Sequence, residues 1–238
     1  MGIETVNVLA VGAHPDDLEI LCGGTLAKYA KAGAKIVMAI LTNGNMGHPE
    51  VEPDEMARIR KGEFENAAAI IGAETIWMDV DDEMSVVDVN SRLMMVDVLR
   101  KSEPDVILTH CEADYHVDHI NASKLVFEAA PLACVKNIKR ELPELTKQPL
   151  IYHFDSIGAV NFLPREYADI TETMATKLAM YKCHKSQDEW MKIATGFDMA
   201  DVIESVAKVR GYAAGVRYAE GFTRVDAWYR GTAERVLP

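Results

Sequence analysis

The sequence lacks any apolar run that approaches the length of a membrane span, and no basic segment opens its N-terminus as in a secretory signal. It is also poor in basic residues, with 25 Lys and Arg against 37 Asp and Glu, for a formal net charge of -12. Because this charge repels phosphate backbones and anionic lipids, neither nucleic acid nor a membrane surface is an expected partner.

Cysteine is scarce as well. The four residues Cys22, Cys111, Cys134 and Cys183 form no C-x-x-C pair, so neither a zinc ribbon nor a thioredoxin-like site is predicted. Scattered cysteines without a signal segment ahead of them predict a reducing, cytoplasmic location. The 238 residues are 49% hydrophobic, which suits one domain over 1–238 with a sizeable core.

The densest chemistry in the chain follows its first apolar run. Residues 6–11 are mostly Val, Leu and Ala, and a short run bounded by Gly and Pro predicts a buried strand. His14 and Asp17 come next, spaced so that one turn would aim both at a metal ion. Asp16, between them, would act as a general base on water. The alternative is that these acids cap a helix, which explains the carboxylates but not the histidine.

A second cluster repeats this layout. Residues 104–109 predict another buried strand, and a segment rich in His, Asp and Glu follows it. His119 would complete a His/Asp/His ligand set and leave the open position that catalytic zinc sites keep. His116 would stabilise an oxyanion or donate a proton, and Asp118 would orient a ligand histidine. Surface residues at a helix start would account for either cluster alone, whereas the two together favour a metal site.

Two motifs in these clusters resemble those of the LmbE/PIG-L family of zinc-dependent N-deacetylases. The segment 13–19 reads A-H-P-D-D-L-E, and 116–119 reads H-V-D-H where the family has H-P-D-H. Val117 therefore departs from the family at a position that carries no ligand. Members remove acetyl groups from N-acetylglucosamine-type sugars, so the resemblance implies that activity.

The resemblance also implies a role for each matching residue. Zinc would be held by His14, Asp17 and His119, the general base would be Asp16, and the tetrahedral intermediate would be stabilised by His116. Another divalent metal is an alternative to zinc.

Two further residues are candidates for substrate binding. The resemblance assigns substrate contact to Arg60, while the alternative is a solvated helix face on which Arg60 pairs with Glu63. His184 is the second candidate, with a capping or surface role as its alternative. The loop 43–53, rich in Gly, Pro and Asn, is expected to face the substrate. The acidic run 79–83 is expected to be solvated or to line the rim of the pocket.

Strands alternate with helices along the chain, which predicts a parallel sheet with right-handed crossovers. Further strands are expected at 35–42, 74–78 and 150–154, and helices at 22–32, 54–71, 89–102, 120–135, 172–183 and 199–210. Asp169 or Thr171 would cap the helix at 172–183. The pair Gly23-Gly24 predicts close packing rather than a phosphate loop. The expected fold class is α/β: a Rossmann-like, doubly wound, mostly parallel sheet in a single domain with an irregular C-terminal part.

The sequence therefore predicts a metal-dependent hydrolase that removes an N-acetyl group from a small N-acetylglucosamine-type sugar. One alternative is a Rossmann-like nucleotide- or sugar-binding protein, which would need a Gly-rich turn where this chain has His14 to Asp17. Another is a hydrolase of a different amide. Because family members often assemble, the resemblance also leaves room for a homo-oligomer.

Overall fold

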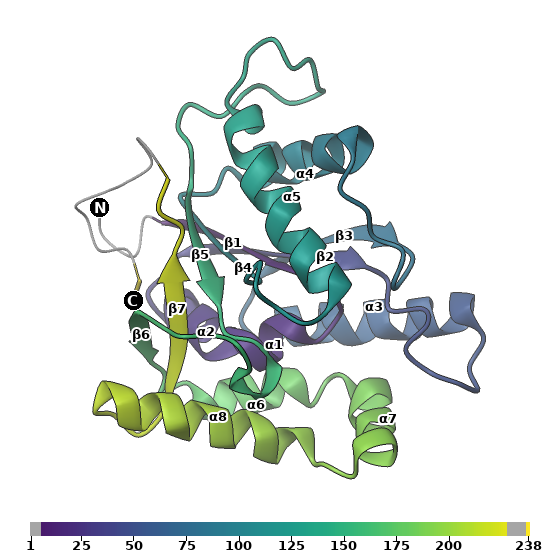
Figure 1. Ribbon diagram of the computed structural model, residues 1–238, viewed down its shortest axis with the longest axis vertical. Helices are drawn as coiled ribbons and strands as arrows, with labels where there is room; N and C mark the ends of the chain where they lie inside the picture. Colours follow the sequence, from purple (N-terminus) through teal and green to yellow (C-terminus); the bar gives the residue numbers. More distant parts are fainter. Residues whose placement is uncertain (1–5, 228–236) are drawn as a thin grey trace.

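The computed structural model describes residues 6–227 and 237–238, which form a seven-stranded sheet between layers of helices (Figure 1). The strands are β1 (Asn7–Gly12), β2 (Lys35–Thr42), β3 (Glu74–Val80), β4 (Val106–Thr109), β5 (Leu150–Phe154), β6 (Glu166–Asp169) and β7 (Ala219–Arg224). The helices are α1 (Asp17–Leu21), α2 (Gly23–Lys31), α3 (Pro53–Ile70), α4 (Val89–Ser102), α5 (Val117–Ala133), α6 (Met174–Tyr181), α7 (Lys185–Thr195) and α8 (Met199–Ala214), with a short 3-10 turn, η2 (Ile157–Ala159). Residues 1–5, on which the expectation about a signal segment rests, lie outside the described residues.

The sheet has the order β3-β2-β1-β4-β5-β7-β6. Neighbouring strands from β3 to β5 are parallel, and β7 pairs antiparallel with both β5 and β6. The predicted mostly parallel, doubly wound α/β sheet is confirmed. The chain leaves β1 towards β2 on one side and returns to β4 on the other, and open α/β sheets bind ligands beyond the carboxyl ends of strands at such a reversal.

Alternate residues of the central strands enter two separate cores. Val8 and Ala10 of β1 face a core shared with α1, α2 and α3, whereas Leu9 and Val11 face a core shared with α4 and α5. The hydrophobic strand residues are therefore buried on both faces, as in other doubly wound sheets. A third core joins α6 to α8, and Figure 1 shows these C-terminal helices beyond α1 and α2. Within the described part of the chain, no helix is long and apolar enough to cross a membrane.

The C-terminal part is more regular than the sequence predicts, because β6, β7 and α7 were not expected. The predicted caps are wrong: α6 begins at Met174, after Thr173, while Asp169 ends β6. Asp169 is paired with Ala219 of β7, and its side chain accepts a hydrogen bond from the amide of Thr171 at 2.9 Å. Asp169 is therefore part of the sheet and does not cap a helix.

Helix α5 begins three residues earlier than predicted. His116 is its N-cap, and the His116 Nδ1 accepts a hydrogen bond from the amide of Asp118 at 3.2 Å. The first turn of α5 therefore contains Asp118 and His119. It fixes both side chains at the carboxyl end of β4.

The start of α2 is held by the far end of the chain. The amides of Gly24 and Thr25 donate to the Glu220 carboxylate of β7 at 2.9 and 2.7 Å. Glu220 also forms a buried ion pair with Lys177 of α6. A Cβ on Gly24 would lie 2.8 Å from Ile170, so close packing explains this glycine, and a carboxylate already occupies the helix N-terminus.

Candidate functional site

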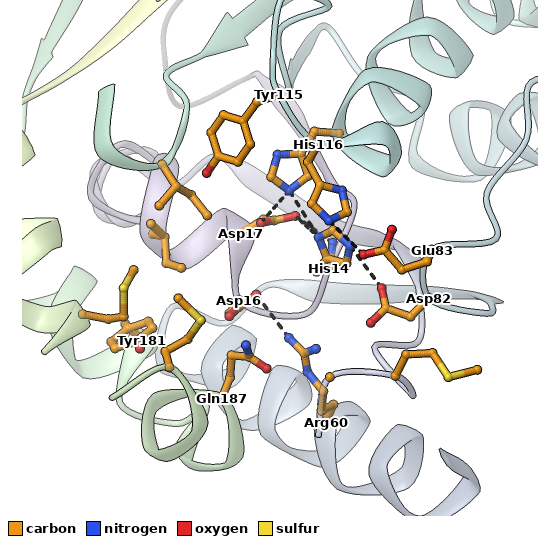
Figure 2. Close-up of a pocket in the computed structure, with 17 residues that line it drawn as sticks. His14, Asp16, Asp17, Arg60, Asp82, Glu83, Tyr115, His116, Tyr181 and Gln187 are labelled. Carbon is orange, nitrogen blue, oxygen red and sulfur yellow. Dashed lines mark hydrogen bonds and ion pairs between the residues drawn. The ribbon is translucent and has the colours of Figure 1, made fainter. Parts of the chain in front are cut away.

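A cavity of about 270 Å³ lies where the chain leaves β1 and enters α5 (Figure 2). It is lined by residues from segments far apart in the sequence: His14, Asp16, Asp17, Ile20, Met46, Gly47, Arg60, Asp82, Glu83, Tyr115, His116, His119, Ile157, Tyr181, Gln187, Met191 and Met199. The two predicted motifs therefore meet in one cavity.

Three electron-pair donors converge at the base of this cavity. His14 Nδ1 lies 3.2 Å from His119 Nε2. Each of these nitrogens also lies 3.4 Å from a carboxylate oxygen of Asp17. The sequence predicted these three side chains as one ligand set, and the structure brings them together.

The far side of each imidazole ring faces carboxylates. His14 Nε2 lies 3.1 Å from Asp82 Oδ1 and 3.4 Å from Asp118 Oδ2. His119 Nδ1 lies 3.2 Å from Asp114 Oδ1. Both nitrogens of each ring thus face a carboxylate; in the neutral tautomer that places the proton on the side of Asp82, Asp118 or Asp114, the lone pairs of His14 Nδ1 and His119 Nε2 are free. Both lone pairs then point towards Asp17, which is an arrangement that a cation stabilises.

The carboxylates around His14 and His119 also determine the pKa values of these residues. Burial opposes the charged form of His14, but hydrogen bonds to Asp118 and Asp17 raise its pKa well above the ordinary value. Burial likewise opposes protonation of His119, yet the charge of Asp17 helps raise the pKa of His119 to about 9. Burial alone would raise the pKa of Asp17, but His119 and His110 lower it well below its usual value. The cluster favours positive charge at its centre, so the residues present fit a divalent metal.

Backbone amides hold Asp17 in place. Its Oδ2 accepts hydrogen bonds from the amides of Ala13 at 3.0 Å and His14 at 2.7 Å. His110 Nε2 lies 3.1 Å from the same oxygen, and the His110 ring stacks on His119 with centroids 4.0 Å apart. Burial lowers the pKa of His110 to about 4, so this ring stays neutral. No role was predicted for His110, although it directly follows β4.

Asp16 and Arg60 form a buried pair at the side of the cavity. Arg60 is 2% exposed, so its interpretation as part of a solvated face is wrong. Its guanidinium donates to the Pro15 carbonyl at 2.6 Å and to Asp16 Oδ1 at 3.3 Å. Burial raises the pKa of Asp16 to about 6, against the effect of Arg60. Gly44 permits this placement, because a Cβ there would lie 2.5 Å from Arg60 Nη1.

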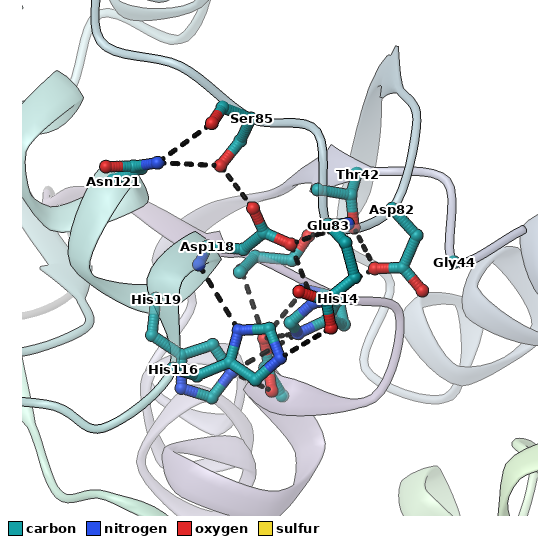
Figure 3. A network of polar contacts seen from close by, with 12 residues as sticks. His14, Thr42, Gly44, Asp82, Glu83, Ser85, His116, Asp118, His119 and Asn121 are labelled. Atoms are coloured by element: carbon teal, nitrogen blue, oxygen red, sulfur yellow. Dashed lines mark hydrogen bonds and ion pairs between the residues drawn. The ribbon is translucent and has the colours of Figure 1, made fainter. Parts of the chain in front are cut away.

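The segment after β3 reaches the site, and Asp82 and Glu83 line the cavity, which agrees with one of the two alternatives predicted for the run 79–83. Asp82 is 6% exposed, so the expectation of a solvated acid is wrong at this position. Ser85 Oγ donates to Asp118 Oδ1, and the Glu83 amide donates to Asp118 Oδ2 at 2.9 Å (Figure 3). Asn121 donates to the Ser85 carbonyl at 2.9 Å. Since β3 is parallel to β2, its carboxyl end shares the sheet edge with the two motifs, and this was the signal available in the sequence.

His116 lies beside this cluster and faces the cavity (Figure 2). Its ring meets His14 edge-on, with centroids 4.6 Å apart. Its Nε2 lies 3.2 Å from Glu83 Oε1 at the rim. His116 is therefore within reach of a substrate that contacts His14.

Two predicted site residues do not line the cavity: Asp118, which contacts His14 from behind, and His184. Among the described residues, His184 has no such contact with a predicted metal ligand. It is fully buried, and its Nε2 lies 3.4 Å from Glu19 Oε2, which is also fully buried. His184 is the N-cap residue of α7. Met46 and Gly47 of the loop 43–53 line the cavity, whereas contact of that loop with the substrate stays a prediction.

The chain matches the family model described as PIG-L, GlcNAc-PI de-N-acetylase, over residues 9–130. It is 32% identical to the diacetylchitobiose deacetylase of Thermococcus kodakarensis over 230 residues, which cover 90% of this chain and 81% of that protein. The chain belongs to the PIG-L family. The predicted family membership is confirmed, and the matched region includes both motifs.

Solved structures of PIG-L-like fold include enzymes of two kinds. The N,N'-diacetylchitobiose deacetylase of Pyrococcus horikoshii superposes with a TM-score of 0.80 at 26% identity, covering 94% of this chain and 85% of that one. The 4-carboxy-2-hydroxymuconate hydratase of Pseudomonas putida superposes with a TM-score of 0.81 at 25% identity, covering 95% of this chain and 99% of that one. The fold therefore supports this PIG-L chain as an enzyme but leaves two reactions to compare.

Proposed function

We propose that this protein is a metal-dependent hydrolase that removes the N-acetyl group from an N-acetylglucosamine-type sugar. The observation that carries the proposal is one cavity that contains three converging electron-pair donors and, beside them, the carboxyl of Asp16. Hydrolysis of an unactivated amide is accelerated by an electrophilic metal ion and a base; the three donors would hold the first, and Asp16 would be the second.

His14, Asp17 and His119 would hold the metal, through His14 Nδ1, His119 Nε2 and the Asp17 carboxylate. Two imidazoles and a carboxylate are ligands that zinc takes in catalytic sites, so zinc is the ion we propose. When bound, the metal would supply Lewis acidity that polarises the acetyl carbonyl and makes water more acidic. Asp118 and Asp82 would orient His14, and Asp114 would orient His119.

Asp16 is proposed as the general base. Its pKa of about 6 keeps it deprotonated at neutral pH and leaves it able to accept a proton. Arg60 holds the carboxyl from one side at 3.3 Å, which positions it without occupying both oxygens. Asp16 takes a proton from the attacking water, whose oxygen bonds to the acetyl carbon.

His116 is proposed to stabilise the oxyanion that this attack creates on the former carbonyl oxygen. The C–N bond then breaks, and the sugar nitrogen takes the proton held by Asp16 or one from His116. The products are acetate and the free amine. Glu83, 3.2 Å from His116 Nε2, would hold that ring towards the cavity.

The charge of the cavity favours a deacetylase over a hydratase of the kind found in Pseudomonas putida. The name of that relative describes a carboxylated substrate. Among the described residues that line this cavity, the one guanidinium belongs to Arg60, which already bonds Pro15 and Asp16, and no lysine is present. Asp82 and Glu83 add negative charge. A neutral acetamido sugar fits this field better than a polycarboxylate.

The test is a substrate panel for the zinc-loaded protein. N-acetylglucosamine and its glycosides should release acetate and free amine in equal amounts, while acetylated peptides and simple amides should release little. Acetate from the peptides or amides alone would overturn the sugar substrate. Hydration of a carboxylated dienol without any acetate release would replace the deacetylase by the hydratase.

The cytoplasmic location and a homo-oligomer stay predictions. The absence of nucleic acid and membrane partners, expected from the net charge of -12, also stays a prediction.

A further inference from the structure

One side of the cavity is apolar. We call Ile20, Ile157, Tyr181, Met191 and Met199 the apolar wall. Its members come from five separate elements: α1, η2, α6, α7 and α8. Figure 2 shows Tyr181 on the far side of the cavity from His116. A substrate that reaches the histidine cluster therefore has hydrocarbon on its other side.

The apolar wall is the outer edge of the third core. Met199 and Tyr181 belong to that core with Ile203 of α8, and Ile20, Ile157 and Met191 pack against it. The wall is therefore supported from behind by packed side chains rather than by a loop. A supported surface of this kind keeps its shape when a ligand binds.

Part of the apolar wall is exposed to the cavity and is available to bind a ligand. Ile20, Ile157 and Met191 are only partly buried, so hydrocarbon faces the cavity. A ligand with an apolar group would remove that surface from water, which is the main driving force for binding in such pockets. The thioether chain of Met191 has three rotatable bonds and adapts to groups of different shape.

The polar contacts of a sugar lie between the wall and the metal cluster. Gln187 of α7 lines the cavity on the same side as Tyr181, and Asp16 lies between it and His14 (Figure 2). An acetamido group at the cluster would place the sugar ring near these side chains and direct its substituent to the wall. The acetyl group itself is then the part furthest from the hydrocarbon.

We propose that the apolar wall binds an uncharged alkyl or aryl aglycone on the N-acetyl sugar. The inference rests on the proposed deacetylase function and specifies its substrate class. An acidic aglycone is disfavoured, because Arg60, the one guanidinium among the described lining residues, is already bonded to Pro15 and Asp16, and Asp82 and Glu83 add negative charge.

The experiment compares β-glycosides of N-acetylglucosamine that carry methyl, butyl, hexyl or phenyl aglycones. The kcat/KM for acetate release should rise by up to about fourfold for each methylene that the wall covers. The gain should appear in KM with kcat little changed, since the aglycone is bound equally in ground and transition states. A carboxyalkyl aglycone of equal length should lose that gain.

Two variants test the wall itself. Met191→Gln and Ile157→Thr change partly buried positions on different elements, and each should lower the hexyl-to-methyl ratio of kcat/KM by roughly fifteenfold, equivalent to two buried methylenes. Met94→Gln is the matched control, because Met94 is 38% exposed on α4 and does not line the cavity. It should leave the ratio unchanged.

The outcomes separate this inference from the proposed function. Equal rates for all aglycones would overturn the inference, because the wall would then not bind the aglycone, while the deacetylase would stand. A gain from longer N-acyl chains in place of longer aglycones would overturn it too. No acetate from any glycoside would overturn the proposed function, and the inference with it.

Discussion

Replacement of Asp16 by Asn should abolish most turnover while metal stays bound. The amide has the shape of the carboxyl but cannot accept the proton of the attacking water. A positioned general base contributes ~10²–10⁴-fold to the rate. The expected loss in kcat corresponds to about 3–5 kcal/mol of activation free energy.

The pH dependence offers a second view of the same residue. Burial raises the pKa of Asp16 to about 6, and a cation bound beside it would lower that pKa again. The wild-type kcat should therefore be constant above pH 6 and fall about tenfold per pH unit once the pH is below the pKa of Asp16. The residual rate of Asp16→Asn should lack this acid limb.

The variant should lose stability only modestly. Arg60 would lose a charged partner at 3.3 Å but would keep the Pro15 carbonyl at 2.6 Å. A weakened buried hydrogen bond costs about 1–3 kcal/mol in the free energy of unfolding. Thermal unfolding should thus show a folded protein with a lowered midpoint.

The assay combines acetate release with elemental analysis of the same sample. Asp97→Asn is the matched control, because Asp97 lies on α4 and its carboxylate pairs with Arg140 at the surface. That variant should keep both metal and turnover. Wild-type turnover by metal-loaded Asp16→Asn would refute the assignment of the base.

Three further predictions concern the metal and the fold. His119→Ala removes one of three proposed ligands and should abolish stoichiometric metal in elemental analysis; a full equivalent would contradict the ligand set. Ser85→Ala removes the hydroxyl that holds Asp118, and metal affinity measured by chelator competition should fall about ten- to a hundredfold. Burial lowers the pKa of His153 in the folded state, so below pH 6.5 the unfolded chain takes up the proton first and stability falls. The urea midpoint of His153→Gln should lose less between pH 7.5 and 5.5 than that of the wild type, and equal losses would count against this burial effect.

The central strands and the two motifs could be predicted because their signals are local. β2 and α4 have the predicted bounds, since a buried apolar run and an amphipathic pattern with clear ends define them. The proximity of His14, Asp17 and His119 could be predicted because the carboxyl ends of parallel strands lie at the same edge of the sheet. That rule needs only the position of each strand.

The remaining site residues depend on contacts between distant segments. Asp82 and Ser85 look like any acidic loop until β3 is placed beside β2. β6 and β7 are short, and Tyr167 pairs with Gly221 far along the chain, so no local pattern marks them. His184 was predicted to contact the substrate, but it is buried away from the cavity against Glu19. That contact joins two distant segments, so the sequence around His184 does not reveal it.

The hydrogen bonds between Glu220 and the start of α2 have a consequence for folding during synthesis. The donor amide of Gly24 and the acceptor carboxylate are 196 residues apart, so the start of α2 lacks this acceptor until Glu220 has left the ribosome. A chain that ended before β7 would leave two helix amides and the buried Lys177 ammonium without their acceptor. The N-terminal motif can therefore be translated early but acquires its folded surroundings last.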